Sequence, residues 1–134
     1  MSHLPDTNFF VYLQRRLEPL RSRYLAAIDA QTTFFLSSIV LYELEVGVAK
    51  SSRIKANRER LKNLVGSDFV FLPFEREDSK AAAHIRALLE NRKQSIGPYD
   101  TLIAGQALAR GLTLVTSNVR EFSRVDGLRW ENWN

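Results

Sequence analysis

The 134-residue chain contains no cysteine. Disulfide bonds, thiolate zinc sites and cysteine nucleophiles are therefore excluded, and a cytoplasmic location is the natural expectation. The sequence also lacks a long uncharged apolar run, a basic stretch followed by an apolar one at its start, internal repeats and low-complexity tracts. We therefore expect a protein without a membrane partner, folded as a single domain over residues 1–134.

The charge of the chain is moderately positive and unevenly distributed. The formal net charge is +4 at pH 7 and the pI is about 9.7. Six basic residues fall between Lys50 and Lys62, where Glu59 is the only acid. This pattern is explained equally well by a solvated helical face and by a surface that attracts a polyanion, such as RNA or an acidic protein tail.

Short apolar segments alternate with longer amphipathic ones along the chain. Strands are predicted up to Asp6 and over residues 32–37, 68–72, 112–116 and 128–130; helices are predicted directly after Asp6 and over residues 21–29, 39–50, 53–65, 75–92 and 98–110. The 39–50 segment is apolar nearly all round, which is typical of a buried helix. Such alternation predicts an α/β fold with a parallel sheet and helices on both faces.

One acidic residue of the 98–110 segment needs an explanation. Asp100 lies in the first turn of a helix made largely of apolar and small residues. A lone buried carboxylate would cost several kcal/mol unless it is paired, protonated or bound to a cation. The carboxyl ends of parallel strands share one edge of the sheet, so Asp6, Glu43, Asp100 and Asn118 could meet there. Oxygen ligands of this kind suit Mg²⁺ or Mn²⁺ and indicate metal-dependent phosphodiester hydrolysis.

Each of these residues also has a local explanation. Asp6 could cap the first helix, and Asn118 with Glu121 three residues later is typical of a capping box. The helix dipole favours Asp100 in a first turn. Periodicity does not distinguish Glu43 from Glu45, since both have apolar helical neighbours.

Four blocks of the sequence occur in the order and spacing of a known family. They are Asp6-Thr7-Asn8, the Ser37–Gly47 segment with Tyr42-Glu43-Leu44, Ile96–Ala104 with Pro98-Tyr99-Asp100, and Leu114–Phe122 with Thr116-Ser117-Asn118. In these blocks the chain resembles PIN-domain ribonucleases, in particular the VapC toxins of bacterial VapBC toxin–antitoxin modules, from about Leu4 to Trp133. The resemblance implies a three-layer α/β/α fold with a central, mostly parallel sheet of four to five strands.

The resemblance also assigns roles to residues. It implies that Asp6, Glu43 and Asp100 are metal ligands, selecting Glu43 over Glu45, and that Asn118 is the fourth catalytic residue, where many members have Asp. Thr116 and Asn8 are expected to support the site. Pro5 departs from the family, which usually has an aliphatic strand residue there, and proline cannot donate a hydrogen bond to a sheet.

The implied activity is that of a toxin. It is an Mg²⁺-dependent endoribonuclease, with Mn²⁺ as a substitute, which cleaves RNA such as tRNA or mRNA and inhibits translation and growth. The implied partners are the RNA substrate, a cognate VapB-type antitoxin that neutralises the toxin, a second copy of the chain in a homodimer or a toxin–antitoxin hetero-oligomer, and operator DNA reached only through the antitoxin. Antitoxin or RNA contacts are expected on the 39–50 helix and the basic helix after it, at Leu41, Lys50, Arg53 and Arg58.

Two other functions fit parts of the pattern. A non-catalytic PIN-like module that binds RNA or protein is compatible with Asn118 and Pro5. A phospho-acceptor receiver domain shares the α/β layout, but it needs clustered acids after its first strand and a lysine after a late strand. Asp6 stands alone, and no lysine follows Lys93.

Overall fold

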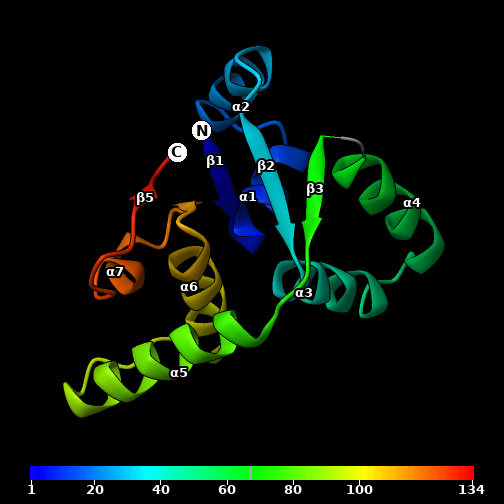
Figure 1. The fold of residues 1–134 in the computed structure, drawn as a ribbon. Coiled ribbons are helices and arrows are strands. Elements are labelled where there is room, and N and C mark those ends of the chain that lie inside the picture. Colours follow the sequence, from blue (N-terminus) through cyan, green and yellow to red (C-terminus); the bar gives the residue numbers. More distant parts are fainter. Residues whose placement is uncertain (67) are drawn as a thin grey trace.

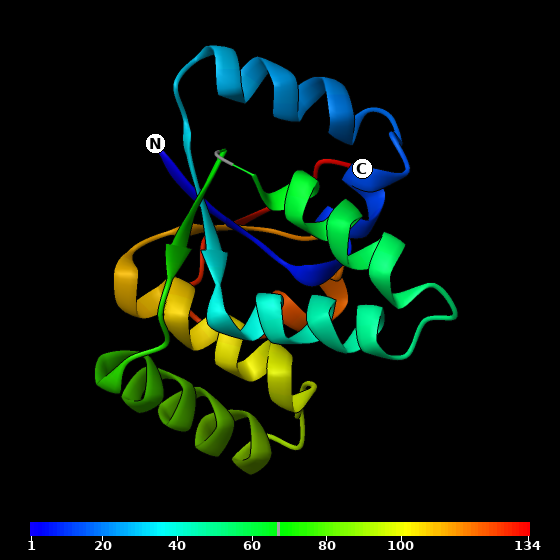
Figure 2. The same cartoon turned by 90° about the vertical axis from the view of Figure 1, so that its right-hand side faces the viewer.

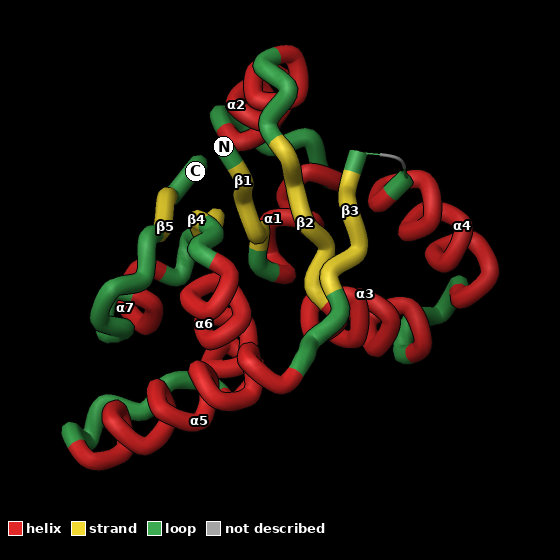
Figure 3. The backbone as a smooth tube through the Cα atoms, in the orientation of Figure 1, coloured by secondary structure: helices red, strands yellow, loops and turns green. Residues whose placement is uncertain are grey.

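The computed structural model describes residues 1–66 and 68–134 and is built around one five-stranded sheet (Figures 1 and 3). All neighbouring strands are parallel, in the order β3-β2-β1-β4-β5. The predicted α/β class is therefore confirmed. The strands are β1 (Ser2–Pro5), β2 (Thr33–Ser37), β3 (Phe69–Leu72), β4 (Thr113–Val115) and β5 (Trp130–Glu131); the helices are α1 (Thr7–Gln14), α2 (Leu20–Asp29), α3 (Ser38–Ala49), α4 (Ile54–Val65), α5 (Arg76–Asn91), α6 (Pro98–Arg110) and α7 (Val119–Phe122).

The order of the strands creates a point where the chain changes direction across the sheet. From β1 to β3 the chain advances strand by strand, whereas β4 returns to the other side of β1. Right-handed crossovers consequently place α1 and α6 on opposite faces of the sheet, as Figures 1 and 2 show. Ligand sites of open parallel sheets lie beyond the carboxyl ends of the strands at such a point, here between β1 and β4.

Local signals in the sequence account for where several helices begin and end. Ser37 caps α3, since its hydroxyl accepts a hydrogen bond from the N–H of Ile39 at 3.1 Å. Glu75 and Asp78 form a capping box at the start of α5. Pro98 occupies the first turn of α6, and Gly111 ends this helix with a left-handed φ of 64°.

Pro5 is accommodated in β1, at the centre of the sheet. It pairs in register with Val115 of β4, and the next residue, Asp6, donates its backbone N–H to Val115 O at 3.0 Å. On the other side of β1, the register with β2 covers Ser2 and His3 and stops before Pro5. The missing N–H of Pro5 therefore ends only the β2 ladder, and the β4 ladder sets the position of Asp6.

The expectation of a buried 39–50 helix is wrong for most of α3. Only Val40 and Val48 are buried, whereas Tyr42 is 51% exposed and Leu41 and Leu44 are half-buried. The helix lies at the carboxyl edge of the sheet, contacting α1, α4 and α6 without being enclosed by them (Figure 1). An apolar helix with open flanks is typical of a surface that another molecule covers. No helix in residues 1–66 and 68–134 is long and apolar enough to cross a membrane.

Helices α5 and α6 form the tightest helical contact of the fold. Gly105 of α6 lies so close to α5 that an ideal Cβ there would be 2.6 Å from N, Cα and Cβ of Ala82. The fully buried carboxylate of Asp78 accepts two hydrogen bonds from the Arg110 guanidinium, both at 2.9 Å. These contacts hold α6, and with it Asp100, in a defined place.

Candidate active site

Side chains from four separate segments converge at the carboxyl edge of the sheet. Asp6 follows β1, Glu43 lies in α3, Asp100 lies in the first turn of α6, and Asn118 follows β4. The charges of Asp6 and Glu43 both raise the pKa of Asp100, which places the three carboxyl groups within electrostatic reach of one another. The structure thus brings together the four residues that we selected from the sequence.

Asp6 is held by both of its carboxylate oxygens. Its Oδ1 accepts the backbone N–H of Phe9 at 3.1 Å and caps α1, while its Oδ2 accepts the Thr116 hydroxyl at 2.6 Å. Capping and a place in the site are therefore compatible for this residue. Asp6 is 5% exposed, and burial raises its pKa to about 6 from 3.8, although the two hydrogen bonds oppose the change.

The two glutamates of α3 face different surroundings. Glu43 accepts a hydrogen bond from the Thr7 hydroxyl at 2.6 Å, and its charge acts on both Asp6 and Asp100. Glu45 instead pairs with Arg58 of α4 at 3.2 Å, on a side chain that is 42% exposed. Glu43 is thus the glutamate at the site, and Thr7 is a supporting residue that our sequence analysis did not select.

Asp100 shares the site with a carboxylate that the sequence had suggested for a different role. The amide of Asn118 donates to Asp100 Oδ2 at 3.3 Å and to Glu121 Oε2 at 3.1 Å, and it makes no cap hydrogen bond to α7. The capping-box interpretation of Asn118 and Glu121 is therefore wrong. Burial is the main cause that raises the pKa of Asp100 to about 7, followed by the hydrogen bond and charge of Glu121.

The remaining predicted residues lie around this centre or away from it. The Thr116 hydroxyl joins Asp6 to the loop after β4, because it also accepts the N–H of Asn118 at 2.9 Å. Asn8 is exposed on α1. Among the predicted contact residues, Leu41 is half-buried, Lys50 and Arg53 are exposed, and Arg58 is engaged with Glu45.

The donor set of the site suits a hard divalent cation. All three predicted ligands offer carboxylate oxygens. Burial is the main cause that raises the pKa values of Asp6 and Asp100, and a bound cation would offset the cost of their charged forms. In residues 1–66 and 68–134, no three His, Cys, Asp or Glu side chains are already arranged closely enough to hold an ion. Binding would therefore require the carboxylates to move closer together.

An open groove runs from the site along α1, α3 and α4. Its volume is about 560 Å³, and it begins at Thr7 and Glu43. Apolar side chains, two arginines and two amides line the rest of it, together with bare backbone at Gly47. These lining residues are Val11, Gln14, Arg15, Leu44, Gly47, Val48, Asn57, Arg60, Leu61 and Leu64. Arg60 belongs to the basic 50–62 segment, but we predicted no role at the site for it or for Arg15. Arg60 and Leu64 are four residues apart and therefore lie on one face of α4.

Comparison with known proteins assigns the chain to a family. The family model of the PIN domain matches residues 4–128, and the chain belongs to that family. It is 34% identical to "Ribonuclease VapC2" of Rickettsia felis over 134 residues, covering 100% of this chain and 99% of that protein. It is 35% identical to "tRNA(fMet)-specific endonuclease VapC" of Shigella flexneri, covering 96% of each chain.

Solved structures agree with this assignment. The fold matches VapBC2 from Rickettsia felis bound to a promoter DNA fragment, with a TM-score of 0.93 and 32% identity over the whole of both chains. It also matches DNA-bound VapBC from Salmonella typhimurium, with a TM-score of 0.89 and 32% identity over 100% of this chain and 99% of that one. Within the PIN domains, the relatives of this chain thus include VapC ribonucleases.

Proposed function

We propose that this chain is the toxin of a toxin–antitoxin module and acts as an Mg²⁺-dependent endoribonuclease. The observation that carries the proposal is the convergence of Asp6, Glu43 and Asp100, beside Asn118 and Glu121, at the switch point of the sheet. Asp6 is buried and the other two acids are half-buried, and such a cluster is costly without a function that uses its charge. The kinship with VapC ribonucleases supports hydrolysis of RNA.

The side chains would divide the work as follows. Asp6, Glu43 and Asp100 would hold Mg²⁺ or Mn²⁺, which when bound polarises phosphate oxygens and lowers the pKa of water. Thr116 and Thr7 fix the orientation of Asp6 and Glu43 through their hydroxyl groups. The Asn118 amide and the Glu121 carboxylate position Asp100.

Cleavage of RNA by matched glutamate variants tests these assignments. Glu43→Gln should reduce cleavage by a factor of at least about 100, because a metal ligand and its charge are lost. Glu45→Gln changes the same chemical group two residues along α3, on another side of the helix, and should leave cleavage unchanged, since Glu45 contacts Arg58 at the surface. Equal effects of the two substitutions would refute the assignment.

Asp100→Asn should abolish both RNA cleavage and growth inhibition while the protein stays folded. Full activity in this variant would end the proposal of a nuclease.

Titration of the wild type with Mn²⁺ tests the alternative of a non-catalytic module, for which no binding of the ion is expected. Sequencing of RNA 5′ ends after brief induction, with Asp100→Asn as the control, would identify the RNA. A relative is named for tRNA(fMet), so tRNA is the first candidate.

The groove along α1, α3 and α4 is the proposed binding site of a VapB-type antitoxin. Apolar side chains line its walls, and Glu43 at its end could receive a basic side chain of the antitoxin. Gly47 faces the groove, and nothing lies within 4 Å of an ideal Cβ there. Gly47→Leu should therefore fold normally but fail to co-purify with the antitoxin, whereas Gly47→Ala should retain it. Retention of the antitoxin by Gly47→Leu would show that it binds elsewhere.

Assembly beyond this pair also follows the VapBC structures. We expect a homodimer of the toxin, and a hetero-oligomer with the antitoxin that contacts operator DNA only through the antitoxin. The VapBC2 complex of Rickettsia felis is bound to a promoter fragment, and the VapBC complex of Salmonella typhimurium is bound to DNA. Mobility-shift assays with operator DNA should give a complex with toxin and antitoxin together and none with the toxin alone. A shift by the toxin alone would contradict this arrangement.

A further inference from the structure

Two exposed tyrosines meet at the rim of the acidic site. Tyr42 of α3 is 51% exposed and Tyr99 of α6 is 42% exposed. Their ring centroids lie 5.4 Å apart with 55° between the planes, and their hydroxyl oxygens are 3.3 Å apart. Each tyrosine directly precedes an acid of the site, Glu43 and Asp100 respectively. The pair therefore moves with the two helices that carry these acids.

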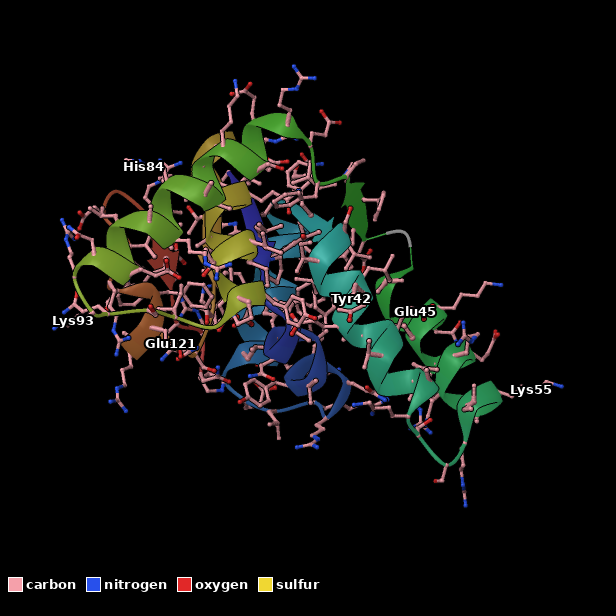
Figure 4. All side chains as sticks on the ribbon, turned by 90° about the horizontal axis from the view of Figure 1, so that it is seen from below. Tyr42, Glu45, Lys55, His84, Lys93 and Glu121 are labelled. Atoms are coloured by element: carbon pink, nitrogen blue, oxygen red, sulfur yellow. The ribbon has the colours of Figure 1, made fainter. Side chains whose placement is uncertain are left out.

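The direction of Tyr42 distinguishes it from its neighbours on α3. Its ring contacts Tyr99 across the gap to α6, whereas Glu45 reaches Arg58 on α4. Figure 4 views this end of the sheet and shows Tyr42 between Glu45 on one side and Glu121 on the other.

An uncharged aromatic surface is useful next to carboxylates that repel phosphate. RNA gains little affinity from charge in this part of the protein, and stacking of a base on an aromatic ring is not opposed by repulsion. A base in a duplex already stacks on its neighbours, so only an unpaired base can use such a surface. The hydroxyl contact holds the two rings as one unit, which limits the side-chain entropy lost on binding.

We propose that Tyr42 and Tyr99 form a stacking platform for an unpaired nucleobase adjacent to the phosphodiester at the carboxylates. The enzyme would accordingly act on single-stranded or looped RNA and would position it through a base as well as through phosphates. This inference rests on the proposed ribonuclease function and adds the feature of the substrate that the rim selects.

Binding of oligonucleotides to an Asp100→Asn protein, which should not cleave them, tests the platform. The Tyr42→Ala/Tyr99→Ala double variant should bind a single-stranded RNA oligomer more weakly by a factor on the order of ten to one hundred. It should bind an abasic ribose-phosphate oligomer of equal length as the parent does. The dependence of binding on salt should not change, because no phosphate contact is removed.

Two further variants make the comparison specific. Tyr42→Phe/Tyr99→Phe keeps the rings and should recover most of the affinity for the base-bearing oligomer. Leu25→Ala alters an exposed apolar residue of α2, at the other end of the sheet in Figure 1, and should have no effect. A DNA oligomer of the same sequence should show the same loss in the alanine variant, since stacking does not involve the 2′-hydroxyl.

The outcomes separate the platform from the nuclease. If the wild type cleaves RNA and the alanine variant binds both oligomers like its parent, the platform is refuted while the nuclease stands. Equal weakening for the base-bearing and abasic oligomers also refutes the platform. It is likewise refuted if the alanine variant is monomeric in sedimentation where its parent is a homodimer, because the rings would then form a protein interface. If the wild type neither cleaves RNA nor binds Mn²⁺, the proposed function itself fails.

Discussion

Asp100→Asn should make the metal-free protein more stable at alkaline pH. The carboxyl pKa rises from 3.8 to about 7 in the folded state, chiefly through burial and then through the carboxyl group of Glu121. At about 1.4 kcal/mol per pKa unit this difference corresponds to about 4 kcal/mol, and because the side chain is only half-buried we expect about half of it. The asparagine amide can donate to Glu121 and accept from Asn118, as a protonated Asp100 would.

The sign of the pH dependence follows from the raised pKa. Below the unfolded value near 4, both states carry a protonated Asp100 and the residue costs nothing. Between these two pKa values the unfolded state releases the proton of Asp100 while the folded state keeps it. The free energy of unfolding of the wild type therefore falls as pH rises, until the pH passes the folded value of about 7, whereas that of the variant does not. The advantage of the variant should therefore be small at about pH 4 and reach about 2 kcal/mol at about pH 8.

Urea unfolding followed by circular dichroism, in EDTA and in excess Mn²⁺, measures this difference. Mn²⁺ should stabilise the wild type in a saturable manner and the variant far less, because binding to the folded state adds to its stability. Asp126→Asn is a suitable control, since Asp126 is 68% exposed in a surface pair with Arg92, and such pairs contribute little to stability. A variant no more stable than the wild type at about pH 8 in EDTA would refute the idea that the ionised carboxylate of Asp100 destabilises the folded protein.

Three other substitutions test the scaffold by unfolding measurements. Gly105→Ala should destabilise the protein by about 3 kcal/mol or more, because the new methyl group would overlap Ala82, and a wild-type midpoint would contradict the close α5–α6 contact. Gly47→Ala should stabilise it by about 0.5–1 kcal/mol, since the methyl group meets open space. Arg110→Ala should cost about 3 kcal/mol at neutral pH by leaving the Asp78 carboxylate buried without its partner. Arg110 lowers the pKa of Asp78 against the effect of burial, so this loss should shrink as acid protonates Asp78.

Much of the secondary structure could be predicted because its signals are local. The helix α6 begins at Pro98 and ends before Gly111, as the conformations of proline and glycine require. The parallel arrangement followed from the alternation of strands and helices, and it placed Asp6 and Asn118 at one edge. The exposure of α3 could not be predicted from its periodicity. A helix that is apolar on all sides can be covered by its own chain or by a partner, and the sequence pattern is the same in both cases.

The details of the site depended on contacts between distant segments. Glu121 follows Asn118 at the spacing of a capping box, and only the approach of Asp100 reveals that the Asn118 amide serves two carboxylates instead. Thr7 follows Asp6 directly in the sequence, but its hydroxyl reaches Glu43, 36 residues away. Such roles arise from packing of the sheet and have no signature in local spacing.

The hydrogen bond between Thr116 and Asp6 has a consequence during synthesis. The two residues are 110 positions apart, and at the usual rate of translation of about 5–20 residues per second the ribosome needs roughly 5–20 s to proceed from one to the other. Until then the first acid has neither its hydroxyl partner nor the strand that positions it. A chain that has not yet reached Thr116 therefore has no complete site. Cellular RNA can be cleaved only by chains whose synthesis has passed this residue.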